Sequence, residues 1–151
     1  EVDNPGSGWN IGHGPTGCWI AHYYLWAAMD LMEGEHFMVL ENDAKFEPDW
    51  RERLDKAKKD VPKDYDFLFP GSCCCADKPK THIAGEVFEV KYPFCTHCYI
   101  IAKKAIPVTL KTMRKVWAPT DIQMPLELFP KLKVYTVLPN IVNQFDTVLQ
   151  P

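Results

Sequence analysis

Apolar residues recur at helical spacing after a Gly- and Pro-rich start. The glycines and prolines of residues 1–16 predict a loop without regular structure. A helix is then predicted from Thr16, which suits the N-cap, to Gly34, which suits the position after the C-cap. Its stripe at helical spacing is Cys18, Ala21, His22, Leu25, Met29 and Met32. Because Trp19 and Trp26 make other faces apolar as well, we expect this helix to be largely buried.

Short apolar runs bounded by turn residues predict the strands. The continuous run at residues 37–40 is typical of a strand covered on both faces in a parallel or mixed sheet. The other predicted strands are residues 65–69, 87–92, 97–102 and 133–138. We expect Pro70, Gly71 and the cysteines after them to form a loop, and residues 143–146 to belong to a tail.

Helical segments alternate with these strands. They are predicted from about Pro48, over residues 104–116 and over residues 120–129. This alternation favours an α/β fold with a mixed, mostly parallel sheet flanked by helices. We find no repeat or linker, and 151 residues suit a single domain over residues 1–151.

Composition and charge narrow the class of protein. A chain with 46% hydrophobic and 13% aromatic residues is not disordered. Seventeen Lys and Arg against 20 Asp and Glu give a net charge of -3, which argues against nucleic acid as a partner. The most apolar stretch, residues 18–32, is interrupted by His22 and Asp30 and is shorter than the roughly 20 residues of a membrane span. We therefore expect no membrane span.

The cysteines allow two interpretations. The six are Cys18, Cys73, Cys74, Cys75, Cys95 and Cys98. Three of them are adjacent, which suits a disulfide framework poorly, so we expect reduced thiols and a reducing, cytoplasmic location. Alternatively, residues 73–75 and the Cys-x-x-Cys at residues 95–98 supply four thiolates to a zinc ion in an interaction module.

A pair of carboxylates follows the predicted strand at residues 37–40, in the motif Glu41-Asn42-Asp43. In open α/β sheets ligands bind outside the carboxyl ends of the strands. Two carboxylates two residues apart can hold a hard divalent cation whose other ligands are phosphate oxygens. A plain turn is the alternative, because Asn and Asp favour turns.

Three further residues have both a functional and an ordinary interpretation. His22 and His97 are either hydrogen-bonded core residues or parts of a site. Asp121 follows Pro119 and Thr120, and it either occupies the first turn of a helix or acts as a general base in the same crevice.

Several motifs occur together in one order. They are Gly17-Cys18-x-x-Ala21-His22-x-x-x-Trp26, Val39-Leu40-Glu41-Asn42-Asp43-Ala44-x-Phe46, Thr96-His97-x-Tyr99-Ile100-Ile101-x-Lys103-Lys104-Ala105, Pro119-Thr120-Asp121, and Val134-Tyr135 with Pro139 and Gln144. Through these motifs residues 17–146 resemble family 25 glycosyltransferases, which include bacterial lipooligosaccharide and collagen galactosyltransferases.

The resemblance implies a GT-A-type domain with an inverting reaction. Such an enzyme transfers a hexose of the galactose type from a UDP-sugar to a hydroxyl of a saccharide or protein acceptor, usually with Mn²⁺ (or Mg²⁺). Carried over by position, Glu41 and Asp43 are the metal ligands, and Asp121 is the base that deprotonates the acceptor.

The same resemblance assigns the donor side of the site. Thr96 and His97 line it, and His22 and Trp26 shape it from the helix. The resemblance also implies that Glu41 and Asn42, the first two positions of the acidic motif, bind the cofactor or donor.

Two departures from the family accompany the resemblance. Asn42 stands where the family motif has its middle acid, so a charge is absent there. Nothing in the chain matches the family's first strand, Ile-Asn-Leu, or its Arg-bearing loop, so we expect a domain truncated at its N-terminus. A noncatalytic binding or structural domain derived from a glycosyltransferase is therefore an alternative function.

Overall fold

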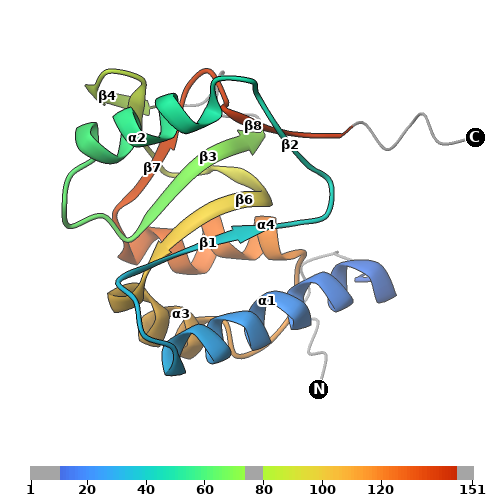
Figure 1. The fold of residues 1–151 in the computed structure, drawn as a ribbon. Helices are drawn as coiled ribbons and strands as arrows, with labels where there is room; N and C mark the ends of the chain where they lie inside the picture. The colour runs from blue at the N-terminus through green and yellow to red at the C-terminus, as the bar shows by residue number, and fades with distance from the viewer. Residues whose placement is uncertain (1–10, 74–79, 146–151) are drawn as a thin grey trace, which may run out of the picture.

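The computed structural model describes residues 11–73 and 80–145, which fold around a six-stranded sheet (Figure 1). In spatial order its strands are β1 (His36–Leu40), β6 (Phe94–Ala102), β3 (Phe67–Cys73), β7 (Val134–Val137), β5 (Val87–Val90) and β4 (Lys80–Ala84). The β3–β7 pair is parallel, and the other neighbouring pairs are antiparallel. The α/β class is confirmed, but the prediction of a mostly parallel sheet is wrong.

The reason for that error lies in the middle of the chain. Parallel neighbours need crossovers of a dozen or more residues, whereas β4 and β5 are joined by a tight turn at Gly85, whose φ is +52°. This turn reverses the chain and pairs β4 with β5 antiparallel. The strand β6, which follows β5 after three residues, pairs instead with β1 and β3 and is antiparallel to both.

The strand β1 is an edge strand, paired to β6 alone among the described strands. Within it Val39 is buried, whereas His36 and Leu40 are exposed, so the prediction of a strand covered on both faces is wrong. The buried strands are interior ones such as β6, in which every residue from Thr96 to Ala102 is buried, and β7, which is buried throughout. A short second sheet pairs β2 (Ala44–Phe46) with β8 (Val142–Gln144), where we had expected a tail.

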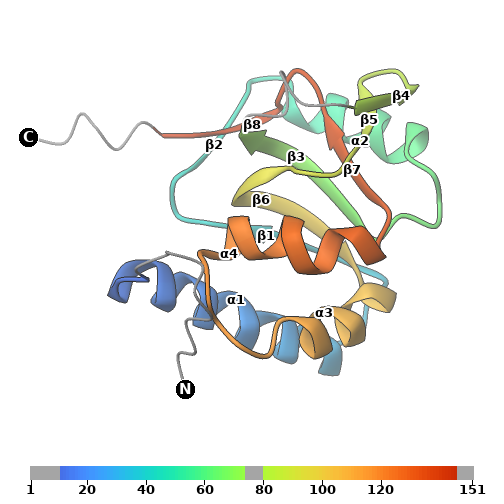
Figure 2. The ribbon, with the colours of Figure 1, turned by 180° about the vertical axis from the view of Figure 1, so that it is seen from behind.

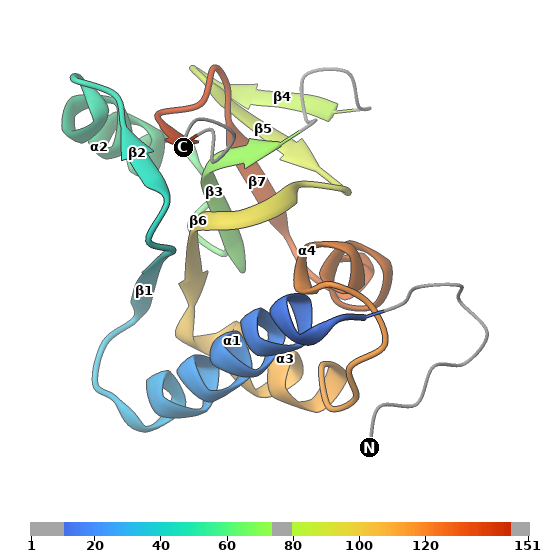
Figure 3. The ribbon, with the colours of Figure 1, turned by 90° about the vertical axis from the view of Figure 1, so that its right-hand side faces the viewer.

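Helices cover both faces of the main sheet (Figures 2 and 3). The first face packs against α1 (His13–Leu31), α3 (Ile106–Thr112) and α4 (Thr120–Gln123), and the second against α2 (Trp50–Asp60). Short turns complete the helical regions at η1 (Lys103–Ala105), η2 (Met124–Leu128) and η3 (Phe129–Lys131). No helix in the described part of the chain combines the length and apolar character that a membrane crossing requires.

The helix α1 is less buried than its sequence indicates. It begins three residues before Thr16 and buries only Trp19, His22, Trp26 and Met29. Leu31 remains 88% exposed, so the expectation of a largely buried helix is wrong.

Pro70 and Gly71 lie inside β3 rather than in a loop. A Cβ atom on Gly71 would stand 1.9 Å from the carbonyl oxygen of Val142 and 2.4 Å from Nε2 of His97. Glycine is therefore needed here because β8 and His97 approach the backbone closely.

Candidate donor and metal site

The site is built where β1 ends beside the first half of β6. In this antiparallel pair Leu40 lies opposite Cys98, so Glu41 emerges next to His97 and Thr96. The Glu41 amide donates to the His97 carbonyl at 3.0 Å, and the Thr96 hydroxyl donates to Glu41 Oε1 at 2.5 Å. Glu41 and Thr96, both predicted for the site, are thus in direct contact.

A chain of hydrogen bonds runs from Glu41 into the core beneath α1. His22 Nε2 lies 2.9 Å from Glu41 Oε1, and His22 Nδ1 lies 2.8 Å from the Tyr99 hydroxyl. The Trp26 indole donates to the same hydroxyl at 2.9 Å. Tyr99 and Trp26 are fully buried and His22 is 5% exposed, so the network fixes Glu41 to the core.

The contact between His22 and Glu41 changes the pKa of both groups. Burial opposes protonation of His22, but hydrogen bonds to Cys18 and Glu41 outweigh it and raise the pKa of His22 to about 9. The hydrogen bond from His22 lowers the pKa of the Glu41 carboxyl against the effect of its burial, and Thr96 adds to the lowering. At neutral pH the two side chains therefore form a partly buried ion pair.

Cys18, His22 and Trp26 follow one another at intervals of four residues, which places them on one face of α1. Cys18 Sγ lies 3.8 Å from Glu41 Oε1, and these two residues with His22 and Asn42 line an open pocket of about 390 Å³ between α1 and the end of β1. This pocket brings together three residues predicted for the site, His22, Glu41 and Asn42.

Asp43 is held by the short second sheet. Its carbonyl oxygen accepts from the Phe145 amide at 2.8 Å, and its Oδ2 accepts from the Gln144 amide group at 2.9 Å. Its Oδ1 is buried and has no hydrogen-bond partner among the residues that the structure describes. Buried polar atoms are normally paired, and a carboxylate oxygen is a ligand that hard divalent cations prefer, so Asp43 fits the implied metal.

Asp121 lies at the first turn of α4. Its Oδ2 accepts from the Cys95 amide at 3.4 Å. The structure thus links Asp121 to Glu41 through the neighbouring residues Cys95 and Thr96 of β6.

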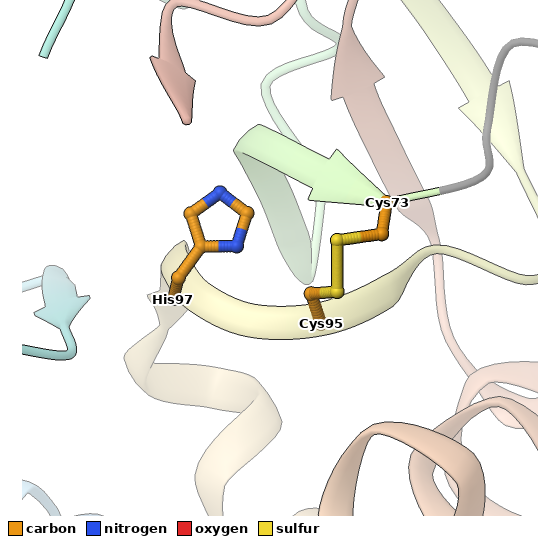
Figure 4. A group of neighbouring side chains, drawn as sticks. All are labelled: Cys73, Cys95 and His97. Atoms are coloured by element: carbon orange, nitrogen blue, oxygen red, sulfur yellow. A yellow bond between two sulfur atoms is a disulfide. The ribbon is translucent and has the colours of Figure 1, made fainter. Parts of the chain in front are cut away.

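His97 is placed differently from Thr96. It is 1% exposed, its Nε2 lies 3.1 Å from the Val142 carbonyl, and its Nδ1 has no partner. Figure 4 shows the ring beside a disulfide between Cys73 and Cys95. His97 is not among the residues that line the pocket next to Glu41.

That disulfide corrects the interpretation of the cysteines. The prediction of reduced thiols is wrong for Cys73 and Cys95, and the argument for a cytoplasmic location no longer includes them. The sequence alone does not reveal the Cys73–Cys95 pair, because the two residues are 22 positions apart and meet only when β3 pairs with β6. Cys98 is a free thiol in the core, where burial raises its pKa to about 12, and Cys74 and Cys75 lie outside the described residues.

Sequence reasoning placed Tyr99 in a motif but gave it no part in the site. Alternation along the strand would place His97 and Tyr99 on one face, because they are two residues apart. The structure instead places Tyr99 beneath α1 and His97 against Val142, so the pattern alone does not reveal which face each side chain takes.

Comparison with known proteins agrees with the acidic motif and its surroundings. Residues 2–124 match the family described as Glycosyltransferase family 25 (LPS biosynthesis protein). The chain therefore belongs to glycosyltransferase family 25.

The relatives it resembles are much longer proteins. A Glycosyltransferase 25 family member of Aedes aegypti is 29% identical over 119 residues, which cover 75% of this chain and 19% of the mosquito protein. The human Inactive glycosyltransferase 25 family member 3 is 27% identical over 85 residues, covering 54% of this chain and 14% of the human protein. The chain thus spans less than a fifth of the length of these relatives.

Proposed function

We propose that residues 1–151 form one GT-A-like domain that transfers a galactose-type hexose from a UDP-sugar to a saccharide or protein hydroxyl, with inversion and with Mn²⁺ or Mg²⁺. The observation that carries the proposal is the buried, unpartnered Oδ1 of Asp43 at the end of β1. Family membership supports the donor class.

Asp43 and Glu41 would hold the divalent cation, and such an ion neutralises the charge of a diphosphate leaving group. Asp43 offers Oδ1, which has no other partner among the described residues, whereas the Glu41 carboxylate is oriented by His22 and Thr96. Asn42 keeps a hydrogen-bonding group in the same pocket without adding charge.

Asp121 would accept the proton of the acceptor hydroxyl. An inverting transfer needs one base on the face of the sugar opposite the leaving group. The Cys95 amide orients the carboxylate through Oδ2, which leaves Oδ1 to receive the proton. Thr96 and His22 position the donor side through Glu41.

Thermal unfolding with Mn²⁺ and UDP-galactose tests the proposal. A ligand at 100 times its Kd adds about 2.7 kcal/mol to the free energy of unfolding, so the melting temperature should rise. Asp43→Asn should abolish the rise, and Asp55→Asn, which changes an exposed aspartate of α2, should keep it. No rise in the wild-type protein, or an equal rise in Asp43→Asn, would contradict the proposal.

A noncatalytic domain is the second candidate. Two observations favour it: Asn42 replaces an acid, and two of the relatives are named inactive or probable inactive. Donor hydrolysis or transfer measured on the same protein separates the candidates, because a noncatalytic domain can bind Mn²⁺ and UDP-galactose without turning the donor over.

A further inference from the structure

A second group of potential metal ligands lies on the other side of Thr96 from the Glu41 pocket. One ligand atom each of Cys73, Cys95 and His97 lies within 4.8 Å of the other two (Figure 4). Cys73 comes from β3, and Cys95 and His97 come from β6, so two paired strands hold all three.

The protonation of His97 is set by its surroundings. A carbonyl oxygen only accepts hydrogen bonds, so Nε2 must donate its proton to Val142. Neutral His97 therefore carries a lone pair on Nδ1, which is buried and unpartnered. Metal-bound histidines are oriented in this way, with the second ring nitrogen donating to a backbone carbonyl.

The backbone around the group is also fixed. His97 packs so closely against Gly71 that a Cβ there would lie 2.4 Å from Nε2. Cys95 has a φ of +67°, a conformation that L-residues rarely adopt and that recurs at ligand clamps.

We propose that Cys73, Cys95 and His97 form a redox-dependent zinc site: a disulfide in the oxidised protein, and two thiolates and Nδ1 around Zn²⁺ in the reduced one. Two thiolates and one imidazole suit zinc, and three protein ligands leave a fourth position for water. The proposal does not depend on the transferase activity, because neither Glu41 nor Asp43 belongs to this group.

The chemistry balances as two steps. Two thiols of a cellular reductant supply two electrons and two protons, the bond between Cys73 and Cys95 breaks, and the reductant leaves as its own disulfide. Zinc then displaces the two cysteine thiol protons, while His97 is already in the form that binds metal.

Metal binding by the reduced and oxidised chain tests this site. A phosphine reductant, which takes oxygen from water to become its oxide, avoids adding competing thiols. After reduction, dialysis against Zn²⁺ should leave about one zinc per chain more than in the oxidised chain, and Co²⁺ should give near-ultraviolet thiolate absorption. The oxidised chain should lack this additional zinc and this absorption, and equal binding by both forms would overturn the proposal.

Variants locate the ligands. His97→Gln should weaken binding by more than about 10-fold, the lower limit for loss of even an outer partner of a zinc ligand. Cys18→Ser and the double variant Cys74→Ser/Cys75→Ser should bind as the wild type does. Unchanged binding in His97→Gln, or loss of binding in either control, would overturn the site.

A measurement on the wild-type protein tests the same ligand without requiring that the His97→Gln variant folds. The ¹⁵N chemical shift of Nδ1 of His97 should change on addition of zinc to the reduced chain, while Nε2 keeps its proton. An unchanged Nδ1 resonance at saturating zinc excludes His97 as a ligand.

Discussion

Two sets of buried polar side chains differ in how their atoms are paired. Under α1, Trp26, Tyr99, His22 and Glu41 form a connected network of hydrogen bonds. Among the described residues, three other buried side-chain atoms have no hydrogen-bond partner: Oδ1 of Asp43, Nδ1 of His97 and Oγ1 of Thr120.

A paired network and a set of unpaired buried atoms have different physical consequences. A paired network rigidifies the elements that it connects, whereas an unpaired buried polar atom costs free energy unless a ligand satisfies it. The network therefore holds the site, and the unpaired Oδ1 of Asp43 and Nδ1 of His97 belong to the two proposed metal sites.

The largest loss of stability is expected from filling the space between Gly71, His97 and Val142. Gly71→Ala places a methyl group 1.9 Å from the Val142 carbonyl oxygen, which forces β3 and β8 apart. We expect a loss of about 3 kcal/mol or more in the free energy of unfolding, measured by urea denaturation.

Gly17→Ala is the matched control for this glycine substitution. A Cβ on Gly17 meets nothing within 4 Å, and Gly17 lies inside α1. Alanine should stabilise the helix by about 0.5–1 kcal/mol. Equal behaviour of the two variants would mean that β8 does not approach Gly71 as described.

A smaller loss is expected from breaking the paired network at its centre. Tyr99→Phe leaves the Trp26 indole and His22 Nδ1 without their partner. Two buried unpaired groups cost about 2–4 kcal/mol together, again measured by urea denaturation. A loss below about 0.5 kcal/mol would show that water or another group satisfies them.

The charge pair at the end of that network should depend on pH. Because the pKa of His22 is raised from 6.5 to about 9, its contribution to stability is complete below pH 6.5 and is lost as the pH rises through 9. The difference in unfolding free energy between metal-free wild type and His22→Gln should therefore shrink over this range. A difference that stays constant would contradict a charged His22.

The smallest effect, of opposite sign, is expected at Thr120. Its hydroxyl is buried and unpartnered, so Thr120→Val removes an unpaired polar atom and keeps the shape. We expect an unchanged stability or a gain of up to about 1 kcal/mol in thermal or chemical unfolding. A clear loss would reveal a partner for this hydroxyl and would weaken the contrast between the two sets of side chains.

Local pattern predicted the elements better than their pairing. The helix near Thr16 and the strand at residues 37–40 exist within a few residues of their expected bounds. Strand direction was wrong because a continuous apolar run does not distinguish a buried parallel strand from a half-buried edge such as β1.

The residues of the candidate site were predictable where they lie close to one another in the sequence. Glu41, Asn42 and Asp43 leave a strand together, and the helical spacing from Cys18 to Trp26 faces the same point. The Cys73–Cys95 bond was not predictable, because it depends on which strands become neighbours. The same holds for Gln144, whose contact with Asp43 joins residues from opposite ends of the described chain.

The pairing of β3 with β7 also governs the order in which this protein can fold. Phe67 lies beside Val134 in the main sheet, and Ala44 beside Gln144 in the second sheet, so both sheets join an earlier segment to one much later in the chain. Contacts so distant along the chain require closure of long loops and form slowly, whereas the β4–β5 hairpin needs only its own turn. In a ribosome-bound chain that has not reached residue 134, one edge of β3 is unpaired because β7 has not yet been synthesised.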